Sequence, residues 1–334
     1  MKKIFVLAPL AVLTIASCQK TEIAHIQDAS QEVTINAFAK NMTKGYTGWT
    51  SGQTAFEEIA DPDKTDGDKT DRKMILSAYN TTKGEDFFLD KTFAKKTDGV
   101  WAADPAIYYP LGGDSYSFLA YSVGTSNPAA TWSGAKKVSL EVTPDSFQDD
   151  ILFSTVSGAS ASTNAEKAID MTFKHAQAWV NVNLCLAKGS GNVDFTVNSI
   201  TWNNIYEQGI LTLDADATPV ASWNFFTQTT KNVAMDDTDI ASGAKLAAAT
   251  ADKDGEKTSL NTLFPAQKHT GFVINYTIGS GDDAQTLEYE YEISEATWAM
   301  GTKYTYNIKI NIVEVTVNPT VEIFVEEAPV EDTI

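Results

Sequence analysis

The chain has 334 residues, of which 44 are acidic and 25 basic, so its formal net charge is −19. An acidic chain is repelled by nucleic acid and by anionic membrane surfaces, so neither is an expected partner. The length allows one large or two ordinary domains. Since only two cysteines occur, a packed core rather than a set of disulfides must stabilise the fold.

Residues 1–18 have the pattern of a secretory signal peptide. Lys2 and Lys3 precede an apolar run from Ile4 to Ile15, and small residues follow before Cys18. This run is too short for a bilayer span, which needs about 20 residues. The last four residues of the segment resemble the lipobox of bacterial lipoproteins, in which the cysteine thiol receives a lipid such as palmitate. We expect lipidation at Cys18, with a plain signal peptide as the alternative.

The next segments are a tether, a strand and a polar stretch. Residues 19–32 are polar and aperiodic, which predicts a tether. Every second residue from Val33 to Ala39 is apolar, so this run is expected to be the first strand. The acidic run 61–68 only superficially suggests a calcium loop, because its glycine falls one place late and no Glu stands at position twelve.

The rest of the chain is dominated by strand signals. Short runs rich in β-branched or aromatic residues and bounded by turn residues predict strands at 74–80, 87–93, 107–110, 116–121, 137–142, 171–184, 195–202, 209–213, 272–278, 286–293 and 304–317. The runs 272–278 and 286–293 are expected to form a hairpin across Gly279–Asp283. The Ala-rich stretch Ser242–Ala251 is at most a short helix. This pattern is typical of an all-β sandwich protein.

A domain boundary is expected near the small, polar span Gly158–Lys167. The predicted organisation is therefore two β-sandwich domains in tandem, at 33–165 and 166–334. Cys185 lies in an alternating apolar run and is expected to be a buried small hydrophobe.

Catalysis has little support in the sequence. His25, His175 and His269 are far apart; His175 is expected to be a hydrogen-bonded structural residue in a strand, and His269 to lie in a loop. No nucleophile elbow, phosphate-binding glycine loop or metal-ligand spacing occurs in the sequence. Abundant carboxylates alone do not indicate a glycosidase pair. We therefore expect no enzymatic activity, no cofactor and no metal.

Several patches, in their order along the chain, resemble a known family. They are Thr43-Lys44-Gly45, Trp101 with Tyr109-Pro110, Phe118-Leu119-Ala120-Tyr121, Asp149–Ser154, Phe173–Ala176, Leu263-Phe264-Pro265 and Trp298–Tyr306. With the lipobox, this order resembles the fimbrillin-like family, the type V pilins and related surface lipoproteins of Gram-negative bacteria. The resemblance implies two transthyretin-like β-sandwich domains, homo- or heteropolymers of pilin subunits, an outer-membrane lipoprotein precursor, and a surface fimbria that serves adhesion to host proteins or glycans.

The resemblance also implies assembly by strand exchange. A surface protease removes the lipidated N-terminus with the first strand, and a strand from the next subunit fills the groove. The candidate cut lies at Lys44-Gly45, where family members often carry Arg, and Arg72 is a second candidate. The candidate donor strand presents Val321, Ile323 and Val325 on one face. The alternative is that this tail completes its own domain.

Two other functions stay open. The chain could be a glycan-binding surface lipoprotein, with Trp49, Trp132 and Trp223 in loop-like sequence as candidate surface contacts. The remaining tryptophans near predicted strands are expected in the core: Trp101, Trp179, Trp202 and Trp298. The chain could also be an anchor or tip subunit of a pilus rather than a stalk subunit.

Overall fold

The computed structural model describes residues 31–39, 73–96, 99–110, 112–123, 128–143, 150–160, 168–190, 193–206, 208–225, 229–235, 243–311 and 315–323. Strands make up nearly all the regular structure in these ranges. The one helical segment described there is the 3-10 turn η3 (Gly281–Asp283). Nothing helical in them has the length and hydropathy of a transmembrane span. The predicted all-β class is confirmed.

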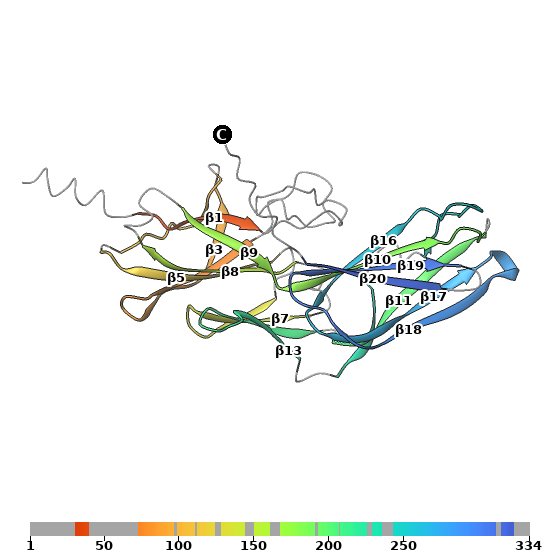
Figure 1. Cartoon of the computed structure of the whole chain (residues 1–334). Helices are drawn as coiled ribbons and strands as arrows, with labels where there is room; N and C mark the ends of the chain where they lie inside the picture. Colours follow the sequence, from red (N-terminus) through yellow and green to blue (C-terminus); the bar gives the residue numbers. More distant parts are fainter. Residues whose placement is uncertain are drawn as a thin grey trace, which may run out of the picture.

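Seven strands of the N-terminal part close into a barrel, seen at the left of Figure 1. Around the barrel they are β1 (Thr34–Ala39), β4 (Trp101–Ala103), β3 (Glu85–Lys95), β2 (Lys73–Asn80), β5 (Ser115–Val123), β8 (Leu152–Ser160) and β9 (Ile169–His175). Side chains alternate between the two faces of a strand. In β9, accordingly, Ile169, Met171 and Phe173 are buried in the barrel, while the residues between them are exposed.

A four-stranded sheet packs on the outside of the barrel. Its order is β13 (Ala221–Asn224), β12 (Gly209–Asp214), β7 (Lys137–Val142) and β6 (Ala129–Trp132). Leu119 and Tyr121 of β5 meet Leu140 and Leu211 in the apolar core between the layers. Strands β12 and β13 follow the predicted boundary in sequence, yet β12 pairs with β7, which precedes it. The boundary between 165 and 166 therefore stays a prediction.

Two sheets form the C-terminal core, at the right of Figure 1. One has the order β16 (Thr258–Pro265), β10 (Gln177–Leu186), β19 (Thr302–Ile310) and β20 (Val315–Ile323). The other has the order β14 (Lys231–Ala234), β11 (Phe195–Ile205), β17 (Lys268–Ile278) and β18 (Gln285–Thr297), with β15 (Ala244–Lys245) also on β11. Val180 and Ile308 of the first sheet share one apolar cluster with Ile200 and Ile274 of the second.

An aromatic cluster lies at the centre of this C-terminal core. The ring centroid of Trp202 lies 4.8 Å from those of both Phe272 and Trp298, in edge-to-face geometry. The four tryptophans expected in the core are all buried: Trp101, Trp179, Trp202 and Trp298. Cys185 is buried and unpaired, as expected.

The predicted strand runs match the structure except at 107–110, where Tyr108 forms only an isolated bridge with Glu32, and in two runs that the structure divides. The predicted hairpin is confirmed, with Ile278 of β17 opposite Gln285 of β18. The run 304–317 is wrong as a single strand, because it divides between the antiparallel strands β19 and β20. The run 171–184 is divided at Ala176 between β9 and β10. Residues 243–251 contain the short strand β15 and no helix.

Candidate strand-exchange site and a polar groove

Strand β1 contributes an apolar face to the barrel core, as its alternation predicts. Val33 and Ile35 are completely buried, and Ala37 packs against the same cluster. Asn36 points the other way, and its Nδ2 donates a hydrogen bond of 2.9 Å to Asp170 Oδ1 of β9. The predicted inward face is therefore confirmed for residues 33–37.

Strand β1 pairs with its two neighbours, β9 and β4, over different lengths. Residues 35–39 run parallel to β9 and lie opposite 169–173, whereas only Thr34 and Ile35 lie opposite β4. Residues just before β1 extend this attachment: Val33 N donates to Ile107 O at 2.8 Å, and Gln31 O accepts from Tyr109 N at 2.9 Å. Glu32 forms an ion pair with Lys96. Strand β1 is thus the element that joins β4 to β9 and closes the barrel.

Loss of β1 would leave two unpaired strand edges beside an apolar trough. The backbone groups of β9 opposite residues 35–39 would lose their partners, as would those of β4 opposite Thr34 and Ile35. Core side chains of β9, including Met171 and Phe173, would lose the cover that Val33 and Ile35 supply. Such an edge is a template for another strand.

The predicted processing and lipidation residues lie outside the described ranges. Cys18, Lys44, Gly45 and Arg72 are all in this group. Their place along the chain is still informative, because β1 ends at Ala39 and β2 begins at Lys73. A cut at either candidate site would break the covalent connection between β1 and the rest of the barrel.

The candidate donor strand lies partly in β20. All of β20 pairs antiparallel with β19, with Val321 opposite Tyr304 and Ile323 opposite Thr302. In this single chain the segment therefore sits at the edge of its own C-terminal sheet. Val325 lies outside the described residues. Donation of this tail to a neighbouring subunit stays a prediction.

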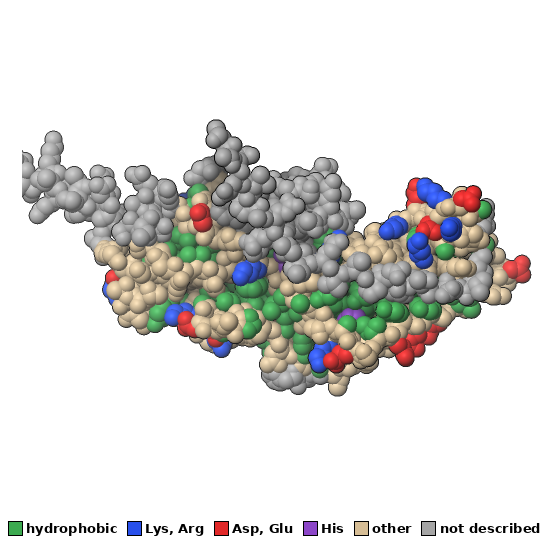
Figure 2. Space-filling model, viewed as in Figure 1, with side chains coloured by type: hydrophobic (Ala, Val, Ile, Leu, Met, Phe, Trp, Pro, Cys, Tyr) green, Lys and Arg blue, Asp and Glu red, His purple; other side chains and the backbone are tan. Residues whose placement is uncertain are grey.

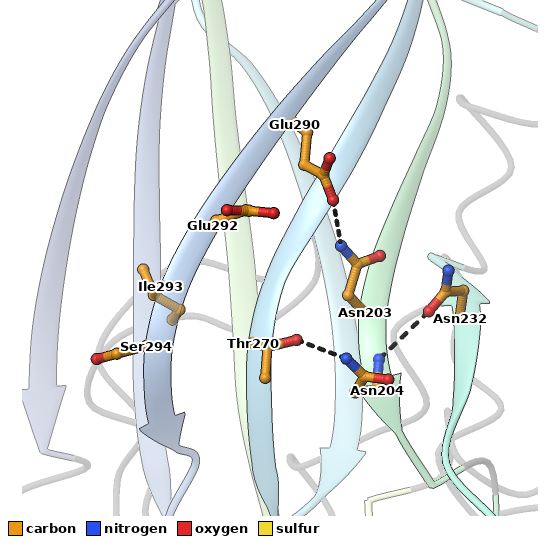
Figure 3. A pocket seen from close by; sticks show the side chains of 8 residues that line it. All are labelled: Asn203, Asn204, Asn232, Thr270, Glu290, Glu292, Ile293 and Ser294. Carbon is orange, nitrogen blue, oxygen red and sulfur yellow. Dashed lines mark hydrogen bonds between the residues drawn. The ribbon is translucent and has the colours of Figure 1, made fainter.

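The C-terminal part also carries a polar groove of about 590 Å³ on its surface (Figure 3). The lining residues come from β11, β14, β17 and β18: Asn203, Asn204, Asn232, Thr270, Glu290, Glu292, Ile293 and Ser294. Sequence reasoning did not find this groove, because its residues are far apart along the chain. The one local signal is the Asn203-Asn204 pair, which directly follows the predicted run 195–202 and belongs to β11 in the structure.

The two described histidines are structural. His175 Nδ1 lies 2.8 Å from Asp150 Oδ2, and both side chains are buried, which confirms the expected hydrogen bond. The expected loop position of His269 is wrong, because β17 extends back to Lys268 and includes it. His269 stacks on Trp298 at 4.3 Å between ring centroids, and burial lowers its pKa to about 4. No metal-binding group of three ligating side chains occurs among the described residues. His25 lies outside them.

The tryptophans predicted at the surface are only half-buried where they are described. Trp132 lies in β6 and packs on Tyr121, with 6.0 Å between ring centroids. Trp223 lies in β13, donates its indole N–H to Ala176 O at 2.7 Å and stacks on Phe225 at 5.9 Å. Each indole is therefore partly covered by a neighbouring aromatic ring. Trp49 lies outside the described residues.

A closed barrel with a four-stranded sheet packed on it, followed by two C-terminal sheets, defines an all-β protein with three apolar cores in its described residues. A family model described as fimbrillin-like matches residues 60–323, so the chain belongs to the fimbrillin-like family. It is similar in structure to a protein from Bacteroides uniformis assigned to cell adhesion, with a TM-score of 0.52, 16% identity, and coverage of 88% of this chain and 98% of that one.

A second solved structure gives the same result. A protein from Bacteroides ovatus, also assigned to cell adhesion, matches with a TM-score of 0.52 and 12% identity, over 90% of this chain and 100% of that one. Identities this low show a shared fold and nothing more. No curated protein matches the sequence.

Proposed function

We propose that this chain is a structural subunit of a cell-surface fimbria, polymerised by strand exchange and serving adhesion. Membership of the fimbrillin-like family supports the fimbrial role. The observation that carries the strand-exchange part is the position of β1, which closes the barrel between β4 and β9. Its connection to β2 is the segment 40–72, which contains the candidate cuts at Lys44-Gly45 and Arg72.

Cleavage in that segment would turn β1 into a replaceable part. The cut strand would be held by its ladder and by Val33 and Ile35, whose burial contributes about 1.5–3 kcal/mol each before entropy is subtracted. A donor strand with apolar residues at alternate positions can supply the same ladder and fill the same trough. The candidate donor carries Val321, Ile323 and Val325 at such positions.

Export as a lipoprotein completes the proposal. Lipidation at Cys18 would hold the precursor at the outer membrane until proteolysis removes the tether 19–32 together with β1. Metabolic labelling with radioactive palmitate should mark the wild-type precursor and leave the Cys18→Ser variant unlabelled. Label on Cys18→Ser would contradict lipidation at this residue.

A reversible lock on β1 tests the strand exchange. Asn36 and Asp170 lie opposite one another on adjacent strands, and their side chains already approach to 2.9 Å. Neighbouring strands lie about 4.8 Å apart, which is within the Cα separation that a disulfide tolerates. The double variant Asn36→Cys/Asp170→Cys, made without residues 1–18, should be cut by a trypsin-like protease but form a ladder of multimers only after reduction.

The matched control is Asn36→Ser/Asp170→Ser, which should polymerise with or without reductant. N-terminal sequencing identifies the cut, with Gly45 as the expected new N-terminus and residue 73 as the expected one for a cut at Arg72. Multimers from the oxidised, fully cross-linked variant would show that β1 does not need to leave, and the strand-exchange proposal would be wrong.

Two truncations test the donor. Deletion of 324–334 removes Val325 and leaves β20 paired with β19, whereas deletion of 319–334 also removes Val321 and Ile323. Both variants should be cut normally, and the longer deletion should abolish polymerisation. Polymers from the longer deletion would refute the donor assignment. A full-length chain that is cut but does not polymerise with itself would favour an anchor or tip subunit.

A further inference from the structure

The polar groove is built by two irregularities in adjacent strands. The pairing of β11 with β14 shifts register between Trp202 and Ile205, and Asn204 adopts a left-handed backbone with φ 55°. The pairing of β17 with β18 shifts between His269 and Gly271. Bulges re-aim side chains and are common beside functional sites. Here they bring Asn203, Asn204 and Thr270 to one place on the outer face of the sheet.

Part of the hydrogen-bonding capacity in the groove is already used. Asn204 Nδ2 donates to Thr270 Oγ1 at 2.9 Å, and Asn204 N donates to Asn232 Oδ1 at 3.3 Å. Asn203 Nδ2 donates a long hydrogen bond of 3.4 Å to Glu290 Oε1. These bonds, drawn in Figure 3, set which end of each amide is nitrogen and which is oxygen.

One buried atom in the groove has no partner. Asn203 is only 8% exposed, and its Oδ1 accepts no hydrogen bond from the part of the chain that the structure describes. In Figure 3 this oxygen points away from Glu290, toward the side of Asn232. A buried amide oxygen without a donor costs about 1–3 kcal/mol, so such an atom in a groove indicates a missing donor.

The unused groups in the groove are mostly acceptors. They include Asn203 Oδ1, the second oxygen of Glu290 and both oxygens of Glu292, while Asn232 Nδ2 is an available donor. Neither glutamate forms an ion pair within the described ranges. Acidic side chains also gather over β18 in Figure 2. A ligand for this groove must therefore donate several hydrogen bonds and carry no negative charge.

We propose that the groove binds a neutral saccharide. Adjacent sugar hydroxyls donate to carboxylate and amide oxygens and accept from Asn232 Nδ2, and Ile293 offers apolar surface for the C–H face of a ring. The volume of about 590 Å³ is within the range of small-molecule sites. A bare divalent cation fits less well, because amide N–H groups of Asn203 and Asn204 point into the cluster and a cation needs six to eight converging oxygens.

The test uses the uncut chain without residues 1–18, so it does not depend on polymerisation. Immobilised neutral oligosaccharides of glucose, galactose, mannose and N-acetylglucosamine are compared with sialylated and sulfated counterparts. We expect saturable binding to at least one neutral glycan and none to the anionic ones. Glu292→Gln removes a charged acceptor and should weaken that binding about tenfold or more.

The matched control is Glu288→Gln, which changes the same charge on the same strand at an exposed position outside the groove. It should bind like the wild type. Asn203→Ala should also weaken binding, and because Asn203 is buried, thermal unfolding is used to check that this variant stays folded. Glu292 is exposed, so Glu292→Gln is not expected to affect folding. Three results would overturn the proposal: no neutral glycan bound, equal losses in Glu288→Gln and Glu292→Gln, or Ca²⁺ bound by the groove without any sugar.

Discussion

Replacement of Ile35 by Ala tests how much of the barrel depends on β1. The Ile35 side chain is fully buried, and it lies opposite Trp101 of β4 and Ile169 of β9. Removal of three carbon groups costs about 0.8 kcal/mol each in transfer free energy, and the cavity left behind adds to this. We expect the free energy of unfolding of the barrel to fall by about 3 kcal/mol.

The assay is urea unfolding of the uncut chain, followed by hydrogen exchange of peptides from β1 and β9. In a chain cut between 40 and 72, the same loss should speed the release of labelled β1 by about a hundredfold. Asn36→Ala is the control, because it removes one solvent-exposed hydrogen bond and should cost less than about 1 kcal/mol. An Ile35→Ala effect no larger than that of Asn36→Ala would refute the claim that β1 is an integral barrel strand.

Two further predictions concern the C-terminal core. Gly271→Ala should destabilise this core by several kcal/mol, because Gly271 has φ +118° and an added Cβ would lie 1.9 Å from Tyr291 O. The control is Gly99→Ala: Gly99 also has a positive φ but has open space around it, so this substitution should cost only about 1 kcal/mol. Urea titration of both variants compares the two losses in the free energy of unfolding. His269 has a folded-state pKa of about 4, below the ordinary 6.5, so the unfolded chain binds more protons between these pH values. The His269 contribution to the free energy of unfolding should therefore be fully present above pH 6.5 and should fall by up to about 3 kcal/mol toward pH 4. In His269→Gln this part of the pH dependence should be absent, which urea unfolding midpoints at pH 7 and pH 4.5 measure. An equal change of midpoint with pH in the wild type and the variant would contradict the prediction.

Strand existence could be predicted from the sequence, because burial of one face imposes an alternation that is visible locally. The runs at 116–121 and 137–142 fall within β5 and β7 for this reason. Two of the failures occur where the chain reverses or bends inside a run that has no Gly or Pro to mark it. The run 304–317 keeps its alternation of apolar and polar residues through 311–314 apart from one shift of phase at Ile312-Val313, and no Gly or Pro marks the division.

The two candidate sites differ in how far the sequence could reveal them. The inward face of β1 was visible in Val33 and Ile35, because it depends on one short segment. The groove depends on Asn203, Thr270 and Glu290, which belong to three strands and converge through two bulges. These register shifts are one residue between β11 and β14 and two between β17 and β18, and such shifts leave almost no mark on composition.

The sequence by itself determined the all-β class and most strand positions, because each follows from local composition and from the two-residue period of a strand. Strand partners were decided by the tertiary structure. The parallel contact of β1 with β9 joins residues more than a hundred positions apart, and β12 reaches back to β7 across the predicted domain boundary. Many pairings are compatible with one pattern of apolar residues, and only packing of the complete cores selects among them.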